Sequence, residues 1–111
     1  MTPPRKAKTL SIKSAAYIAG LIDGEGSVTL TRKHKDDMRQ PALTIASSER
    51  QLLEFVLEQT DVGKITNKKT KPQYKPAFTY AVYNRQALNI LSQLEPLLLS
   101  YKKARARLLI D

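Results

Sequence analysis

The sequence contains no cysteine, no tryptophan and one histidine among its 111 residues. Without cysteine the chain can form no disulfide and no thiolate metal site, and a single histidine argues against a histidine-rich metal site or a serine triad. No apolar run approaches the roughly 18 residues that a membrane span requires, and residues 1–13 lack the apolar segment of a signal peptide. These absences favour an intracellular protein with no membrane partner, although they do not identify the compartment.

Acidic residues are also scarce. Ten Asp and Glu stand against 19 Lys and Arg, which gives a formal charge of +9 at pH 7. No acid occurs between residues 62 and 94, and both ends of the chain are rich in Lys and Arg. Solvated lysines would explain any single charge, but three basic zones with an acid-free stretch between them favour a polyanionic partner such as nucleic acid.

The apolar spacing predicts a mixed α+β domain with the element order α-β-β-α-β-β-α-α and a four-stranded antiparallel sheet. Residues 1–13 are expected to form a basic, flexible tail, and residues 14–111 a single domain. The expected strands cover residues 27–31, 42–46, 64–66 and 78–82. The expected helix caps are Ser14, then Ser47 or Ser48, and then Asn84, and Pro96 is expected to begin the last helix.

Each helix and strand is expected to turn one face to the core. The first helix is expected to bury Tyr17, Ile18, Leu21 and Ile22, and the last helix Leu97, Tyr101, Ala104 and Leu108. Strand alternation predicts a core face of Val28, Leu30, Leu43, Ile45, Ile65, Phe78, Tyr80 and Val82. The opposite face has hydroxyls, Lys and Gln but no acid, which favours a surface that meets nucleic acid over one that meets only water.

Small residues recur along the first helix at Ala16, Gly20 and Gly24. Glycine inside a helix costs about 1 kcal/mol relative to alanine, so this ridge indicates the close approach of another backbone. The partner helix could come from the same chain or from a second copy across a two-fold axis. In the second case two Glu25 carboxylates would come close, and divalent cations such as Mg²⁺ would neutralise them. The alternative is that Glu25 is an exposed turn residue.

Residues 18–26 read IAGLIDGEG, and this segment resembles the LAGLIDADG motif of the homing endonucleases. Six of the nine residues are identical, and the acid keeps its place at Glu25. The predicted element order is similar to the α-β-β-α-β-β-α core of that family, with its saddle-shaped sheet. Residues 94–98 resemble the segment that precedes the last shared helix.

The resemblance implies a site-specific endonuclease for double-stranded DNA that acts in intron homing. With one motif the chain resembles the homodimeric class, whose DNA sites are long and pseudopalindromic. Glu25 would be the catalytic, metal-binding acid and the Gly24 carbonyl a second ligand. A metal-activated water would cut one phosphodiester per strand and leave short 3′ overhangs. Mg²⁺ is the expected metal, Mn²⁺ is expected to substitute, and Ca²⁺ is expected to support binding without cleavage.

The resemblance and the strand alternation together assign further residues. The expected dimer interface consists of Ala16, Ala19, Gly20, Asp23 and Gly24. The expected base-reading residues are Thr29, Thr31, Lys33, Gln40, Thr44, Lys64, Thr66, Lys68 and Thr79. Lys69, Lys71 and Lys75 are expected to hold DNA phosphates.

One departure concerns the basic residue that family enzymes place near the scissile phosphate. Tyr101 stands at that position, so a one-residue shift makes Lys102 the expected catalytic lysine, with Lys103 as the alternative. If neither serves, the chain would be a non-cleaving relative, acting as an RNA maturase or a DNA-binding regulator. An unrelated basic α+β protein, such as a ribosomal component, would explain the charge but not the ridge of small residues. The target sequence and the genetic context are not predicted.

Overall fold

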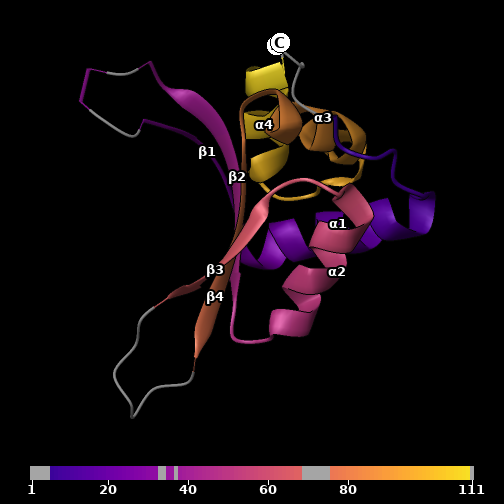
Figure 1. Cartoon of the computed structure of the whole chain (residues 1–111). Coiled ribbons are helices and arrows are strands. Elements are labelled where there is room, and N and C mark those ends of the chain that lie inside the picture. Colours follow the sequence, from indigo (N-terminus) through magenta and orange to yellow (C-terminus); the bar gives the residue numbers. More distant parts are fainter. Residues whose placement is uncertain (1–5, 33–34, 37, 69–75, 111) are drawn as a thin grey trace.

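Four strands form one antiparallel sheet, and the helices pack on one of its faces (Figure 1). The computed structural model describes residues 6–32, 35–36, 38–68 and 76–110. The helices are α1 (Ile12–Glu25), α2 (Arg50–Thr60), α3 (Asn84–Leu94) and α4 (Lys102–Ile110), with a 3₁₀ turn, η1 (Glu95–Leu97), between the last two. The strands are β1 (Gly26–Thr31), β2 (Gln40–Ser47), β3 (Lys64–Lys68) and β4 (Ala77–Tyr83).

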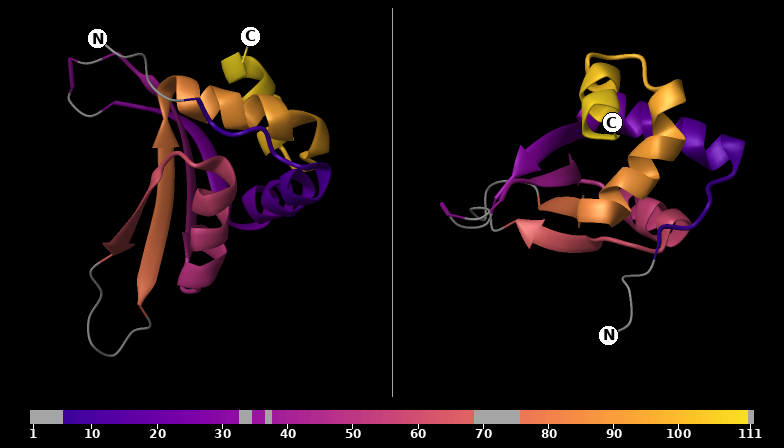
Figure 2. Two further views of the ribbon diagram at one scale, coloured as in Figure 1. Left: turned by 45° about the vertical axis from the view of Figure 1, so that its right-hand side comes forward. Right: turned by 90° about the horizontal axis from the view of Figure 1, so that it is seen from above.

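The strand order is β1-β2-β4-β3, so β1 and β3 are the edge strands. The predicted α+β class, the element order and all four strands are confirmed. Figure 2 shows the two layers from two further directions, with the helical layer on one side and a sheet face that no helix covers on the other. Within the described residues, no helix is long and apolar enough to span a membrane.

The core lies between the sheet and the helices. Its largest fully buried side chains are Tyr80, Ile18, Ile22, Leu43, Ile45, Leu53, Ile90, Leu91, Leu94, Leu98, Val28 and Val56. Each such aliphatic side chain contributes about 1.5–3 kcal/mol when it leaves water. The predicted core face of the sheet is therefore confirmed except at Leu30. That side chain is 48% exposed, because it lies where β1 approaches the hairpin end, opposite Pro41.

Tyr80 joins the C-terminal end of α2 to the sheet. Its hydroxyl donates to the Val62 carbonyl at 2.7 Å and lies 3.0 Å from the Thr60 hydroxyl. Burial raises the pKa of Tyr80 to about 12, although the bond with Thr60 lowers it. A Cβ on Gly63 would lie 2.6 Å from the Tyr80 ring, and the φ of Gly63 is +100°. Glycine is therefore required at this turn for both space and conformation.

The first helix begins earlier than predicted. Its cap is Ser11, whose hydroxyl accepts a hydrogen bond from the Ser14 backbone N–H, and helix α1 starts at Ile12. The described residues that precede it are also held in place: the Lys8 N–H donates to the Thr60 carbonyl, and the Leu10 N–H donates to Gln93 Oε1. The predicted free tail through residue 13 is thus wrong from residue 8 onward.

The caps of α2 and α3 also differ from the prediction. Helix α2 begins after Glu49, and the Ser47 hydroxyl accepts from the Glu49 N–H one turn before the helix. Asn84 is the first residue of α3 rather than its cap, and the preceding Tyr83 makes no side-chain cap bond. Both helices are therefore positioned by their packing on the sheet rather than by a side-chain cap.

The last helix is the largest error of the sequence-based prediction. Pro96 lies in η1, and α4 begins only at Lys102. The expected buried stripe is exposed at all four positions, Leu97, Tyr101, Ala104 and Leu108. Lys102 and Ala106 are buried instead. The break follows from contacts between Asp23 and residues 99 and 100, which set the start of α4 and so its rotation.

Candidate functional site

Helix α1 ends where its chain turns directly into β1. The Gly26 N–H donates to the Ile22 carbonyl and closes the helix. A Cβ on Gly26 would lie 2.8 Å from the Ile22 Cα, which is backbone and cannot rotate away. This glycine therefore lets the strand leave the helix without a loop. As a result, Glu25 sits at a fixed corner between the helix and the first strand.

Glu25 is exposed, and no described residue forms a hydrogen bond or an ion pair with its carboxylate. The described part of one chain holds no group of three or more His, Cys, Asp or Glu that could bind a metal ion. One carboxylate and the Gly24 carbonyl form an incomplete set of hard oxygen ligands. Mg²⁺ commonly binds through one or two carboxylates together with waters and phosphates, so this set fits Mg²⁺ when DNA supplies the remaining ligands.

Asp23, two residues earlier, has a different role. Its carboxylate accepts from the Leu99 N–H at 2.9 Å, from the Ser100 N–H at 3.0 Å and from the Ser100 hydroxyl at 2.5 Å. Burial raises the pKa of Asp23, but these hydrogen bonds and the charge of Lys102 outweigh it, and the net pKa is lowered. Asp23 therefore ties the C-terminal end of α1 to the segment before α4.

Lys102 lies at the same end of α1. Its ammonium donates to the Ile22 carbonyl at 2.7 Å and to the Asp23 carbonyl at 2.9 Å, and the residue is only 7% exposed. These carbonyls belong to the negative end of the helix dipole, which a cation stabilises. The structure thus brings Lys102 to the corner that carries Glu25. Lys103 is half-buried, and among the described residues its side chain forms no hydrogen bond or ion pair at this corner.

Tyr101 lies beside these residues and is largely exposed. Its ring is flanked by the Lys102 ammonium at 5.8 Å and by the Arg105 guanidinium at 5.2 Å. The Arg105 guanidinium also lies 3.5 Å from the Val28 carbonyl of β1. The start of α4 therefore places two cations on either side of Tyr101, close to the end of α1.

The exposed face of α1 carries the ridge of small residues. Ala16, Gly20 and Gly24 are exposed, and a Cβ on Gly20 or Gly24 would meet nothing within 4 Å. The fold of the single chain therefore does not require glycine at these two positions. Ala19, which was predicted for the dimer interface, is buried in the core of its own chain and is not part of the exposed ridge.

The uncovered face of the sheet collects the predicted base-reading residues into rows. Thr29 pairs with Ala42, which pairs with Tyr83. Side chains of directly paired residues lie on the same face of a sheet. The other rows are Thr31 with Gln40, Ser27 with Thr44, Ala81 and Lys64, and Ala46 with Thr79 and Thr66.

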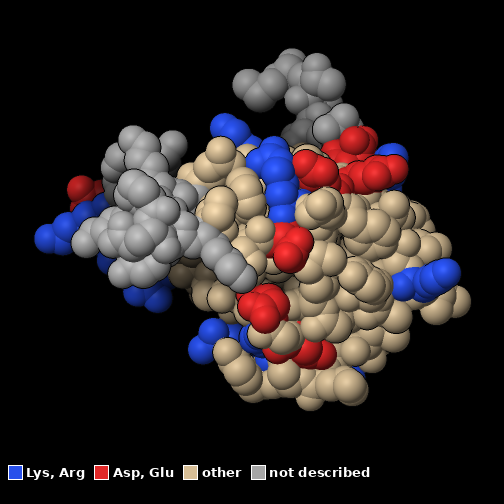
Figure 3. All heavy atoms as spheres, turned by 90° about the horizontal axis from the view of Figure 1, so that it is seen from below, with Lys and Arg blue, Asp and Glu red and all other residues tan. Residues whose placement is uncertain are grey.

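Charge differs between the two sides of the molecule. None of the four strands contains an acidic residue. In the view from below, the acidic side chains lie mainly over the centre and the upper right, whereas basic side chains lie along the left margin and also at the top and right (Figure 3). The uncovered sheet face therefore suits a polyanion better than the helical side does.

Sequence reasoning missed Tyr83 on this face. Its ring is exposed, and it lies between two hollows, one of about 590 Å³ beside Lys64 and Arg85 and one of about 500 Å³ beside Arg32 and Gln40. The alternation that assigned Thr79 and Ala81 to this face extends by two residues to Tyr83.

Four lysines that were predicted to contact DNA lie outside the described residues: Lys33, Lys69, Lys71 and Lys75.

The fold and the motif agree with the results of comparison with known proteins. The model of the LAGLIDADG-like domain matches residues 13–99. Among solved structures, the homing endonuclease I-CvuI, in complex with its target in the presence of calcium, matches with a TM-score of 0.70 and 21% identity. The archaeal intron-encoded homing endonuclease I-Vdi141I, complexed with DNA, matches with a TM-score of 0.68 and 24% identity.

These matches cover most of this chain but only part of the known ones. The match to I-CvuI covers 88% of this chain and 64% of that one, and the match to I-Vdi141I covers 86% and 63%. No match to a curated protein was found. The chain therefore has the fold of these homing endonucleases. More particularly, the chain belongs to the LAGLIDADG-like family, because the family model matches most of its length.

Proposed function

We propose that this protein is a site-specific endonuclease for double-stranded DNA that works as a homodimer with a divalent metal. The observation that carries the proposal is the position of Glu25, an exposed carboxylate without a partner in the described chain, at the end of a helix whose exposed face is made of small residues. The I-CvuI complex described above was obtained in the presence of calcium, and a second I-CvuI complex, with the I-CreI target, in the presence of magnesium with its DNA not cleaved. These structures support the use of a divalent metal.

The ridge supports the dimer. Ala16, Gly20 and Gly24 allow a second helix to approach the backbone of α1 closely, which longer side chains would prevent. The two glycines together cost the isolated helix about 2 kcal/mol relative to alanine, and nothing in the described single chain offsets that cost. A second copy that packs α1 against α1 provides the offset. It also brings one Glu25 from each chain to the two-fold axis.

The uncovered sheet faces of the two copies then form one continuous surface along the DNA. Threonine, glutamine and lysine side chains in the rows around Thr44 and Thr79 offer donors and acceptors to base edges in the major groove. Because the dimer is two-fold symmetric, the site is expected to be pseudopalindromic. The sheet face thus supplies the selectivity and the α1 ends supply the chemistry.

The Glu25 carboxylate and the Gly24 carbonyl would hold the metal, with DNA phosphates and waters as the remaining ligands. When bound, Mg²⁺ would polarise the scissile phosphate and lower the pKa of the attacking water. Glu25 is exposed and directly precedes β1, so in this proposal its carboxylate would meet the backbone of DNA that lies on the sheet. One phosphodiester per strand would be cut, with short 3′ overhangs.

Lys102 would assist at the same corner. Its ammonium group donates two hydrogen bonds, to the Ile22 and Asp23 carbonyls, and no described residue accepts a hydrogen bond from its third proton. That proton is available to a phosphate oxygen or to a water near it. A lysine held by two carbonyls also needs no reorganisation when the substrate arrives.

The test is selection of bound duplexes from a random DNA library in Ca²⁺, followed by transfer of the selected duplexes to Mg²⁺. A long pseudopalindrome that is cut in Mg²⁺ supports the proposal. Glu25→Gln is expected to retain binding and lose cleavage, whereas Glu58→Gln, which removes an exposed carboxylate from α2, is expected to retain both.

The other outcomes point elsewhere. A pseudopalindrome that remains intact in Mg²⁺ would contradict the endonuclease and favour a DNA-binding regulator. No enriched duplex at all would contradict the DNA target, and the same selection with RNA would then test the maturase alternative.

A further inference from the structure

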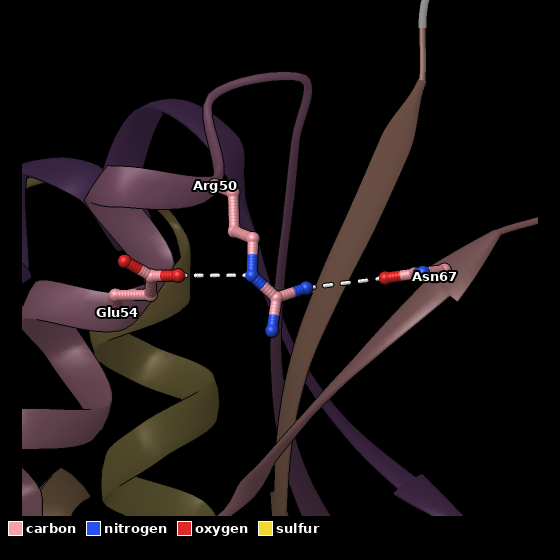
Figure 4. Close-up of polar contacts among 3 residues, drawn as sticks. All are labelled: Arg50, Glu54 and Asn67. Carbon is pink, nitrogen blue, oxygen red and sulfur yellow. Dashed lines mark hydrogen bonds and ion pairs between the residues drawn. The ribbon is translucent and has the colours of Figure 1, made fainter.

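Arg50, the first residue of α2, is a basic side chain that the proposed function does not use. Its Nε donates to Glu54 Oε1 at 2.9 Å, and its Nη1 donates to Asn67 Oδ1 at 3.1 Å (Figure 4). Its guanidinium carbon also lies 5.4 Å from the centre of the Phe78 ring. One side chain on the helical layer therefore contacts both strands of the β3–β4 hairpin.

The contacted pair holds a particular position in the sheet. Asn67 and Phe78 are direct cross-strand partners, and Phe78 also pairs with Ser47, the last residue of β2. Beyond this row the hairpin consists of its own two strands only, through the pair of Lys68 with Ala77. A two-stranded hairpin is marginally stable alone, so its direction depends on what holds this last three-stranded row.

Few apolar contacts are available to hold it. Ile65 and Phe78, whose side chains face the helices at this part of the hairpin, are only half-buried. Arg50 adds contacts where apolar packing is sparse. Its flat guanidinium packs over the Phe78 ring and at the same time donates to the Asn67 amide oxygen. Lysine cannot make both contacts in this way.

The contacts of Arg50 contribute little to overall stability. The Arg50 side chain is 45% exposed and that of Glu54 is 54% exposed, and exposed ion pairs of this spacing contribute only a few tenths of a kcal/mol. Arg50 is also not placed to touch nucleic acid that lies on the uncovered face. Asn67 and Phe78 alternate with Thr66 and Thr79, so their row faces the helices.

We propose that Arg50 is a positioning residue that sets the direction of the β3–β4 hairpin, and thereby the base selectivity at the part of the DNA site that the hairpin meets. The proposal rests on the proposed function for its DNA readout. Thr66 and Thr79 lie one residue from the row that Arg50 holds, on the uncovered face. A shift of that row moves both hydroxyls relative to the base edges, while the rows nearer β1 stay in place.

The experiment compares Arg50→Met and Arg50→Lys with Arg107→Met. Arg107 is an exposed arginine in an ion pair with Glu95 on the opposite side of the fold, so its loss removes the same charge without touching the hairpin. Base preference is measured position by position in Ca²⁺. Both Arg50 variants are expected to lose about tenfold in preference at the base positions that depend on Thr66 and Thr79 and to keep the preference elsewhere, because a good base contact discriminates by about that factor.

Backbone amide exchange provides a readout that does not depend on DNA. Both Arg50 variants are expected to exchange about tenfold faster in residues 64–68 and 77–79, with unchanged exchange in β1 and an unchanged melting temperature. Unchanged hairpin exchange would overturn the positioning role. A uniform loss of affinity in Arg50→Met that matches Arg107→Met, with Arg50→Lys like the wild type, would also overturn it, because charge alone would then explain Arg50.

If the wild-type protein selects no DNA sequence, the proposed function fails, but the exchange experiment still decides whether Arg50 holds the hairpin. Faster exchange together with unchanged base preference at every position of the site would show that the hairpin moves without reading DNA. That result would reject the selectivity proposal while leaving the endonuclease assignment untouched.

Discussion

The two faces of α1 differ in what they do for the chain. The inner face buries Ala15, Ile18, Ala19 and Ile22 against the sheet and the other helices. The outer face carries Ala16, Gly20 and Gly24, whose small size no described neighbour requires. The inner face therefore stabilises the single chain, whereas the outer face lowers the stability of the helix. The proposed α1–α1 dimer would account for this difference.

The same contrast separates the two acids at the end of the helix. Asp23 is held by Leu99 and Ser100, while Glu25 is free of described partners. Substitution of a residue that is held by its own chain, such as Asp23, is expected to change the stability of the fold. Substitution of a residue without such contacts, such as Glu25, is expected to change assembly or cleavage with little effect on folding.

The largest expected effect is on cleavage. Glu25→Gln removes the only carboxylate that the described chain offers to a metal at this corner, so the cleavage rate is expected to fall by about a thousandfold or more. The melting temperature is expected to stay unchanged, because Glu25 makes no described contact. Single-turnover cleavage of the selected site and a thermal melt measure the two quantities. A stable Glu25→Gln protein that still cuts at near the wild-type rate would assign the chemistry elsewhere.

The next effect contrasts two glycines. Gly26→Ala is expected to cost about 2–3 kcal/mol in the free energy of unfolding, because its Cβ would press on the Ile22 backbone. Gly24→Ala is expected to stabilise the isolated chain slightly, since helix propensity improves by up to about 1 kcal/mol. It is expected to weaken the dimer. Urea unfolding and sedimentation equilibrium separate the two, and equal losses of stability in both variants would be inconsistent with this interpretation.

Lys102→Met is expected to cost about 2 kcal/mol, because two hydrogen bonds from a charged donor are lost at the end of α1. Lys103→Met serves as the matched control, since it removes a neighbouring charge that has no contact with the α1 carbonyls. Urea unfolding of both variants is the measurement. If the two lysines proved equivalent, the capping role of Lys102 would be wrong.

The smallest expected effect is a pH dependence due to Asp23. Its folded pKa is lowered, so it contributes stability above its unfolded pKa of about 3.9, and that contribution is lost as pH falls through the folded value. Asp23→Asn is expected to be about 1 kcal/mol less stable than the wild type at pH 7. Because the wild type alone loses this contribution in acid, the difference should shrink below about pH 4 in urea titrations. A difference that stays constant down to pH 2 would show that Asp23 does not act as a carboxylate.

Sequence patterns predicted the strands and the family correctly, because both depend on residues that are close together in the chain. Period-two alternation predicted all four strands and the two faces of the sheet, because each strand pairs along most of its length. The motif at residues 18–26 predicted the family, since small residues and an acid at a fixed spacing leave few alternatives. The register of Thr29, Thr44 and Thr79 on one face followed from the same alternation.

Tertiary contacts decided the rest. The last helix could not be predicted, because Asp23 holds residues 99 and 100 out of the helix, and the bonded residues are 76 and 77 positions apart in the sequence. Ala19 was predicted to lie in the dimer interface because small residues look alike in sequence, whereas helix rotation places it in the core. No sequence pattern distinguished Arg50 from other basic residues, because its contacts with Asn67 and Phe78 depend on how the β3–β4 hairpin lies against α2.

The most direct test of the central claim is a mixing experiment with subunits that lack Glu25. Wild-type and Glu25→Gln chains are unfolded together, refolded in varied ratios at constant total concentration, and assayed for cleavage of the selected site in Mg²⁺. If two Glu25 residues meet in one dimer and both are required, the rate follows the square of the wild-type fraction, and an equal mixture retains about one quarter of the activity. A linear dependence, with about one half retained, would contradict a shared site built at the outer face of α1.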